Sequence, residues 1–175
     1  MTSEMSDVYH FAPRRACKDE LLAKIRYLQT SDQWTFISLT LEALARSRNL
    51  GVGFLVIDGD EGHEVVAGYG VPHEVYIFEE EIFARTVVFR EFDEQQLRFI
   101  KELAPKNFPE LKYLISIPVK FKGETIGSIC LGDNEVTSYA SVDQILAMYT
   151  TATLIERTID TLLNIISVRD ALQLF

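Results

Sequence analysis

From Tyr113 to Asp133, apolar residues recur at every second position, as in two β-strands joined by a turn at Lys122-Gly123. In its first half, every second residue is apolar, which predicts a core-facing side: Ile115, Ile117, Val119 and Phe121. In its second half both sides are largely apolar, and strict alternation puts Ile126 and Cys130 on one side and Thr125, Gly127, Ile129 and Leu131 on the other. Glycine reaches the positive φ of a tight turn. We therefore expect a β-hairpin near the middle of a sheet.

Two helices are predicted before the first strand. After Lys18, apolar residues recur at helical spacing, and after a break at Thr30-Ser31-Asp32 a second stripe follows: Leu21, Leu22, Ile25 and Leu28, then Trp34, Ile37, Leu41, Leu44 and Ala45. The polar residues from Met1 to Arg15 predict a mobile leader. We expect residues 1–16 to be this leader and residues 17–175 to form a single domain.

Between these helices and the hairpin, Val52 to Asp58 predicts a strand, and Glu64 to Tyr69 predicts its antiparallel partner. From Val71 to Arg90, apolar residues are mixed with acidic ones, and both helix and irregular structure remain open. Phe92 to Ala104 predicts a helix, because Leu97, Ile100 and Leu103 share one helical side and acidic residues occupy the first turn.

A long helix is predicted from Val142 to Leu174, a stretch without glycine or proline. Its apolar stripe has alternating steps of three and four and contains Met148, Ile155, Ile159, Leu162 and Ile166. Such a stripe exceeds what a small sheet covers, so the turns from Ile159 onward are expected to pack on the amino-terminal helices or on a second subunit. The order of elements predicts an α+β fold with one antiparallel sheet.

Composition narrows the possible functions. The 26 acidic and 17 basic residues give a net charge of -9, which disfavours nucleic-acid binding because phosphates would be repelled. No apolar run is long enough to span a membrane, and no signal peptide begins the chain, so a cytoplasmic, bacterial protein is expected. Cys17 and Cys130 are interpreted as free thiols, and Cys130 as a small core residue.

The segment from Tyr113 to Ile159 resembles the closing half of a GAF domain. The features that carry the resemblance are Ile117-Pro118, the turn at Lys122-Gly123, Ile126-Gly127, Tyr139 ahead of Asp143, and the final helix from Val142. IFARTVVFRE, at Ile82 to Glu91, resembles the segment before the variable pocket wall of GAF modules in bacterial signalling proteins. The resemblance covers roughly Gln33 to Ile166.

This resemblance implies a GAF/PAS-like (profilin-like) α+β fold. Its antiparallel sheet would have five or six strands, with the amino- and carboxy-terminal helices on one face. A helical and loop insert, Val71 to Ala104, would lie over the other face and cover a ligand-sized pocket. A stand-alone, non-catalytic sensory or regulatory protein is expected, which binds a small molecule and signals through homodimerisation or a signalling partner. The alternative is a ligand-free dimeric interaction module in a signalling complex.

More specific GAF functions are less favoured. GAF domains that bind cyclic nucleotides carry an Asn-Lys, Phe and Asp-Glu pattern, and at the matching places this chain has Asp133-Asn134, Tyr139 and Asp143-Gln144. Bilin-binding GAF domains carry an Asp-Ile-Pro run, and here the matching residues are Ser116-Ile117-Pro118. Free methionine-R-sulfoxide reductases use thiols lining the pocket, but Val71 to Lys112 contains no cysteine. No cofactor is assigned.

A metal site is not expected, because His10, His63 and His73 lack ligand spacing and are interpreted as surface or loop residues. Glu79-Glu80-Glu81 is interpreted as a solvated helix face. Aromatic walls with one or two cationic groups suit a small anionic or planar ligand, although the same aromatics could simply fill the core. The predicted pocket lining is Tyr69, Tyr76, Phe83, Arg85, Phe89, Arg98, Tyr113 and Ser116, and the predicted dimer interface is Met148, Ile155, Ile159, Leu162 and Ile166.

Overall fold

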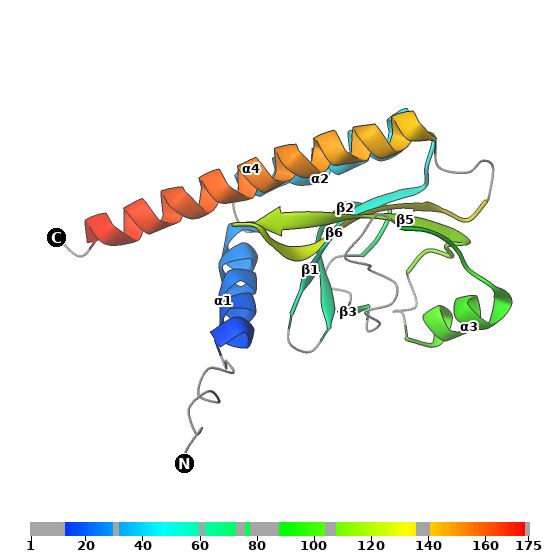
Figure 1. Ribbon diagram of the computed structural model, residues 1–175, viewed down its shortest axis with the longest axis horizontal. Helices are drawn as coiled ribbons and strands as arrows, with labels where there is room; N and C mark the ends of the chain where they lie inside the picture. Colours follow the sequence, from blue (N-terminus) through cyan, green and yellow to red (C-terminus); the bar gives the residue numbers. More distant parts are fainter. Residues whose placement is uncertain are drawn as a thin grey trace, which may run out of the picture.

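A computed structural model of the chain describes residues 13–29, 32–59, 62–72, 76–77, 88–103, 108–135 and 141–173 (Figure 1). Along the chain the elements are α1 Pro13–Leu28, α2 Asp32–Ser47, β1 Val52–Asp58, β2 His63–Tyr69, β3 Tyr76–Ile77, β4 Val88–Glu91, α3 Glu94–Leu103, β5 Tyr113–Phe121, β6 Glu124–Asp133 and α4 Val142–Gln173. The strands described form one antiparallel sheet of six, in the order β3-β2-β1-β6-β5-β4. The predicted α+β class and strand number are therefore confirmed.

The predicted hairpin is formed by β5 and β6, and β6 lies in the middle of the sheet between β5 and β1. Phe121 pairs with Glu124 across a two-residue turn. Both turn residues have positive φ, 49° at Lys122 and 80° at Gly123, which is the geometry of a type I′ turn. This turn matches the right-handed twist of the two strands, so the local sequence is sufficient to set the hairpin.

One detail of the predicted hairpin is wrong. Thr125 lies opposite Lys120 and Gly127 lies opposite Val119, so Ile126 is an extra residue in β6. Such a bulge changes the phase of the alternation. Ile126 therefore joins the core on the same side as Ile129, whereas Cys130 lies in the cluster on the opposite side.

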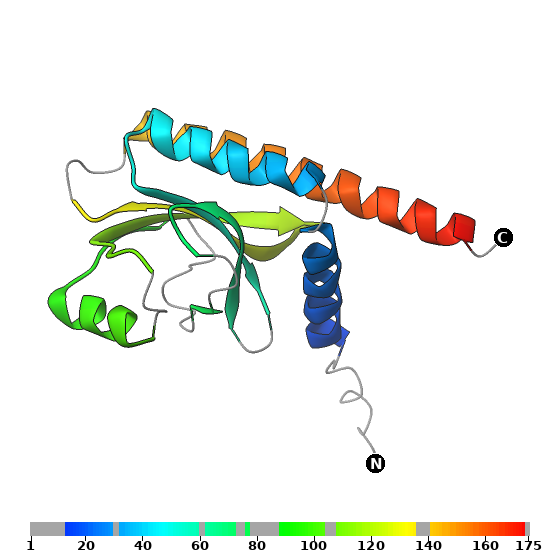
Figure 2. The same ribbon diagram turned by 180° about the vertical axis from the view of Figure 1, so that it is seen from behind.

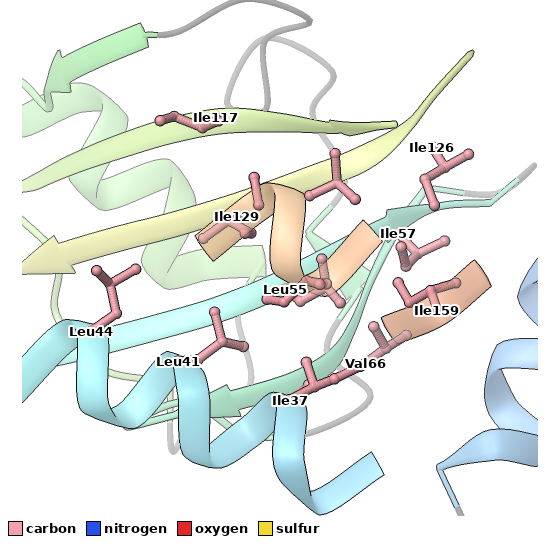
Figure 3. Packing of buried hydrophobic residues seen from close by; sticks show 14 of the residues in the cluster. Ile37, Leu41, Leu44, Leu55, Ile57, Val66, Ile117, Ile126, Ile129 and Ile159 are labelled. Carbon is pink, nitrogen blue, oxygen red and sulfur yellow. The ribbon is translucent and has the colours of Figure 1, made fainter. Parts of the chain in front are cut away.

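Two antiparallel helices cover one face of the sheet. α2 packs on β1 and β2, α4 packs on β5, and the two helices lie side by side (Figures 1 and 2). Figure 3 shows Ile37, Leu41 and Leu44 of α2 directed at the strands, near Leu55 and Ile129. The predicted α2 stripe is thus confirmed as a core face.

A second bulge ties α2 to β2. Leu55 pairs with Ala67 and Val56 pairs with Val65, so Val66 is left between the two pairs. The Val66 carbonyl accepts hydrogen bonds from Trp34 Nε1 at 2.8 Å and from Gln29 Nε2 at 2.7 Å. Side chains from the helical layer thereby satisfy a carbonyl at the irregular point of the ladder.

The apolar stripe of α4 belongs to the core of its own chain. Met148, Ile155, Ile159 and Leu162 are all buried, and Ile166 packs partly buried on the same cluster. Leu22, Ile25 and Leu28 of α1 are members of that cluster, and Arg169 Nη2 donates to the Tyr27 hydroxyl at 2.8 Å. The expected packing on the amino-terminal helices is therefore confirmed. The assignment of Met148, Ile155, Ile159 and Leu162 to a dimer interface is wrong, because burial within one chain leaves them no surface for another. Dimerisation itself remains a prediction.

The amino-terminal boundary also differs from expectation. α1 begins at Pro13, inside the stretch predicted as a leader, and residues 1–12 lie outside the described part of the chain. Proline suits a first helical position, because the N–H it lacks would have no partner there.

The helix of the insert lies on the other face of the sheet. α3 lies on the side opposite α2 and α4 (Figures 1 and 2). Its start is a capping box in which the Gln96 N–H donates to Asp93 Oδ1 at 2.8 Å and the Asp93 N–H donates to Gln96 Oε1 at 3.0 Å. Two short strands, β3 and β4, occur in the segment for which helix and irregular structure were both open, and both add to the sheet edges.

Candidate ligand-binding face of the sheet

The sheet face under the insert has its own small core, separate from the one under α2 and α4. Its buried members are Val52, Phe54, Val56, Val65, Phe92, Leu111, Leu114 and Cys130, with Val71, Leu97 and Phe108 packed partly buried against them. These residues come from β1, β2, β5 and β6 and from the segments on either side of α3. The residues that pack on this face therefore come from α3 and its flanking segments, and not from α2 and α4.

Polar side chains lie in the middle of this apolar face. Ser116 of β5 and Cys130 of β6 are cross-strand partners, and their Oγ and Sγ atoms are 3.4 Å apart. Ser128, two residues before Cys130, shares its side of the strand and pairs with Val56 of β1. All three side chains are buried, so hydroxyl and thiol groups are held inside a largely apolar environment.

A carboxylate–imidazole contact extends this polar group toward the β1–β2 turn. Asp58 lies two residues after Val56 and pairs in register with His63. Their side chains meet at 2.7 Å between Asp58 Oδ1 and His63 Nδ1, and His63 is only 7% exposed. Ser116, Ser128, Cys130, Asp58 and His63 are called the polar strip below.

The chemistry of the strip suits binding better than nucleophilic attack. Burial raises the pKa of Cys130 to about 12, with a further contribution from the negative charge of Asp58, against a lowering by the hydrogen bond with Ser116. Only a thiolate is an effective nucleophile, so Cys130 is a poor one in this state. The serine hydroxyls can donate and accept hydrogen bonds. No group of three or more His, Cys, Asp or Glu residues that could hold a metal occurs in the described ranges.

The predicted pocket residues fall in different places. Ser116 lies on the insert-facing side, as expected. Tyr113 is buried in the core between the sheet and the helices α2 and α4. Tyr69 packs on that same core, and the Arg46 guanidinium lies 5.2 Å from the centroid of its ring. The prediction that these two tyrosines line a site under the insert is wrong, because their strand positions place them on the opposite face.

The remaining pocket residues stay predictions. Arg98 lies on the exposed surface of α3. Tyr76 and Phe89 contribute backbone to β3 and β4, where Phe89 pairs with Ile115 and Tyr76 with Glu64, but their side chains are outside the described set. Phe83 and Arg85 lie outside the described residues, as do His10, His73 and the Glu79-Glu80-Glu81 run.

The sequence interpretation missed three residues of the strip: Asp58, His63 and Ser128. The interpretation of His63 as a surface or loop histidine is wrong, because it is buried in β2. A signal was present: Asp58 continues the alternation of Phe54 and Val56, and a short turn between the two predicted strands would set His63 opposite it.

No family model matches the sequence, and no curated protein matches it. Solved structures do match. The GAF domain of an Acinetobacter phosphoenolpyruvate-protein phosphotransferase is 13% identical, with a TM-score of 0.58 over 90% of this chain and 95% of that one. The blue-light absorbing form of the PixJ GAF domain from Thermosynechococcus elongatus is 13% identical, with a TM-score of 0.57 over 85% of this chain and 96% of that one.

A third similar structure is the phycoerythrobilin-bound GAF domain of a cyanobacterial phytochrome, 12% identical, with a TM-score of 0.52 over 85% of this chain and 97% of that one. At these identities the similarity establishes the fold. The chain has a GAF-like fold, as its sequence indicated, and the GAF domain of a putative sensor histidine kinase from Pseudomonas syringae pv. tomato is among the structures that share it. Across the described residues, no helix is both long and apolar enough to cross a membrane.

Proposed function

We propose that the chain is a non-catalytic sensory or regulatory GAF-like protein that binds a small molecule on the insert-facing side of its sheet. The observation that carries this proposal is the polar strip, which places hydroxyl groups and a buried carboxylate–imidazole pair in an otherwise apolar face. Binding sites for small molecules combine apolar walls with a few fixed polar groups in this way. The bilin-bound GAF domain among the similar structures is an example of a GAF-like fold that holds a ligand.

The chemistry of the strip favours a ligand held without a covalent bond. A thioether to Cys130 would need an ionisable thiol, whereas burial raises the pKa of this thiol to about 12. Ser116 and Ser128 instead suit a small ligand with hydrogen-bonding groups. A cytoplasmic location in a bacterium is part of the same proposal, and it is supported by the bacterial sources of the similar structures.

A thermal-shift screen with amino acids, nucleotides and small organic acids tests this function, because a ligand that binds only the folded state raises the melting temperature. The shift should shrink in Ser116→Val, which removes a hydroxyl from the strip. It should persist in the control Ser167→Val, whose hydroxyl donates to the Leu163 carbonyl on α4, far from the strip. If no compound class raises the melting temperature, the sensor function is refuted. An equal shift in Ser116→Val would place the ligand elsewhere.

A second candidate function is an interaction module that signals by assembly with another protein. It is favoured by large apolar side chains that are exposed on α2 and α4: Phe36, Leu39, Val142, Leu146, Tyr149, Leu154, Ile165, Val168 and Leu172. Exposed apolar groups on adjacent helices are typical of protein interfaces. Assembly would be detected by sedimentation velocity and ligand binding by thermal shift, so the two candidates have separate readouts.

A further inference from the structure

The polar strip crosses the sheet from β2 to β5, and its exposure to solvent differs between its two ends. The side chains of Asp58 and His63 are 19% and 8% exposed. The other three residues of the strip are almost completely buried, with exposed fractions of 2% for Ser128, 1% for Ser116 and 0% for Cys130. A small molecule that approaches the strip therefore meets the carboxylate of Asp58 first.

This exposed end lies at the turn of the β1–β2 hairpin. In Figures 1 and 2 the hairpin curves away from α2 and α4, so its turn lies at a distance from both helices. The turn is closed by the Gly59 N–H, which donates to the Gly62 carbonyl at 2.7 Å. Between these glycines the sequence has Asp60 and Glu61 and no basic residue. Asp58 thus belongs to a segment of the chain with a negative charge.

The carboxylate of Asp58 is held in place by the ring of His63. Oδ1 of Asp58 lies 2.7 Å from Nδ1 of His63, and because a carboxylate oxygen only accepts hydrogen bonds, the ring donates. The charge of Asp58 acts further along the strip: burial is the main cause of the raised pKa of Cys130, and the negative charge of Asp58 adds to it. A polar group of a ligand placed beside the strip would experience the same negative field.

The basic residues around the strip do not offset this charge. Arg26 binds Glu64 on the other face of β2. Lys120 is exposed in β5, two strands from β1 and so roughly 10 Å from it, and Arg90 is in β4, three strands and roughly 14 Å from β1. At such distances, charges that water reaches are largely screened. In the described part of this face, no lysine or arginine side chain is buried against the strip.

We propose, on the basis of the small-molecule function described above, that the ligand is an organic amine whose ammonium group is bound by the carboxylate of Asp58. Its apolar part lies against Val56 and Val65, a cross-strand pair of buried residues on the same side of β1 and β2. The ammonium group donates a charge-assisted hydrogen bond, which is stronger than a neutral one. A small anion would be repelled by the same carboxylate.

Two sets of probes that share an apolar skeleton and differ in their polar group test this ligand class. The first set is phenethylamine, 2-phenylethanol and 3-phenylpropanoate, and the second is butylamine, 1-butanol and pentanoate. Each probe is titrated into the wild-type chain at millimolar concentrations, and its dissociation constant is obtained from the rise in melting temperature. We expect each amine to bind roughly tenfold more tightly than the alcohol of its set, and the carboxylates to give no shift.

Asp58→Asn tests the residue, because it removes the charge and keeps the size of the side chain. The advantage of each amine over its alcohol should disappear in this variant. The matched control is Asp160→Asn, which makes the same change at an exposed position of α4 and should leave the advantage intact. Far-UV circular dichroism checks that both variants are folded. Salt gives a readout on the wild-type chain itself, since screening should weaken the amines more than the alcohols.

The outcomes separate the ligand class from the function on which it rests. The amine class is wrong if the carboxylates bind more tightly than the amines, or if Asp58→Asn or added salt leaves the advantage of the amines unchanged. It is also wrong if another compound class raises the melting temperature and these amines do not. In each of these cases small-molecule binding itself stands. If no compound of any class raises the melting temperature, the small-molecule function fails, and the amine class fails with it.

Discussion

Arg26 of α1 binds the carboxylate of Glu64 in β2 through three contacts: Nε donates to both carboxylate oxygens at 3.1 Å, and Nη2 lies 2.5 Å from Oε2. The Glu64 side chain is 3% exposed, whereas that of Arg26 is 48% exposed. On the opposite face of the same strand, the preceding residue, His63, pairs with Asp58 of the polar strip. Both residues also pair with β3, so this end of β2 connects the insert, the candidate ligand face and α1.

Replacing Arg26 by Ala should destabilise the fold by about 2–3 kcal/mol, because a buried carboxylate would lose its guanidinium partner. Urea unfolding followed by circular dichroism measures the change. The control is Lys24→Ala on the same helix, which removes an exposed, solvent-screened ion pair with Glu20 and should leave the stability close to that of the wild type. Equal effects of the two substitutions would contradict a special role for the Arg26–Glu64 pair.

Gly127 should tolerate no side chain. A Cβ added there would lie 1.9 Å from the carbonyl oxygen of Val56 and 2.9 Å from the Cα of Ile57, both backbone atoms of the neighbouring strand. Gly127→Ala would therefore force β1 and β6 apart, and we expect a loss of at least about 3 kcal/mol or failure to fold. Gly51→Ala is the comparison, because the nearest atoms to a Cβ there would be those of the Asp133 side chain, at 3.5 Å or more. Its stability should remain close to that of the wild type.

Cys130 should be inert in the folded protein. With a pKa of about 12, its thiolate fraction near pH 8 is about a thousandfold smaller than that of a thiol at the reference value of 9.0. In a Cys17→Ser background, where Cys130 is the sole thiol, iodoacetamide should modify the native chain only as fast as it opens, and the urea-unfolded chain rapidly. Fast labelling of native protein would contradict the burial of this residue.

The same thiol links stability to pH. Between about pH 9 and 12, Cys130 keeps its proton in the folded chain and loses it in the unfolded chain. The folded state then binds more protons, so its stability should fall as the pH rises through this window. Unfolding free energies of the Cys17→Ser protein and of Cys17→Ser with Cys130→Ala, compared across the window, isolate this contribution. The fall should be smaller in the double variant, and parallel curves would contradict the raised pKa.

Trp34 and Gln29 should act as a coupled pair, because both donate to the Val66 carbonyl at the bulge of β2. Trp34→Phe or Gln29→Ala alone leaves that carbonyl one donor, and the hydrogen-bond loss should be about 1 kcal/mol. The double variant leaves it none, so its destabilisation should exceed the sum of the single effects by at least about 0.5 kcal/mol. Chemical denaturation of the four proteins completes the cycle, and strict additivity would show that the bulge carbonyl finds another donor.

Some elements of the fold were predictable from the sequence, and others were not. The β5–β6 hairpin and the α2 stripe were predictable, because alternation along a strand and helical spacing are local patterns and Lys122-Gly123 supplies a compatible turn. The order of those elements predicted the α+β class, and the GAF-like fold was implied by the resemblance of the segment from Tyr113 to Ile159 to a GAF domain. The bulge at Ile126 was not predictable, because it depends on how Val119 and Lys120 pair across the ladder. One extra residue there moves Ile126 to the other side of the sheet.

The candidate site was predicted only in part. Ser116 was identified, but Tyr69 and Tyr113 were assigned to the wrong side, and Asp58 and His63 were missed. A periodic pattern tells which residues share a side of a strand, yet it contains no information about which of the two covering layers that side will meet. For the same reason, the pattern left open whether the turns from Ile159 onward pack on the amino-terminal helices or on a second subunit, and the structure places Ile159 in one core with α1 residues.

The sequence by itself determined the longer helices and strands, their antiparallel class and the acidic character of the chain, since these depend on neighbouring residues and on composition. Only the tertiary structure decided which side of each strand faces the insert, that Asp58 meets His63, and that the apolar stripe of α4 is buried in the core of its own chain. These relationships join residues far apart along the chain, and they arise when the sheet closes and the helices choose the face on which they pack.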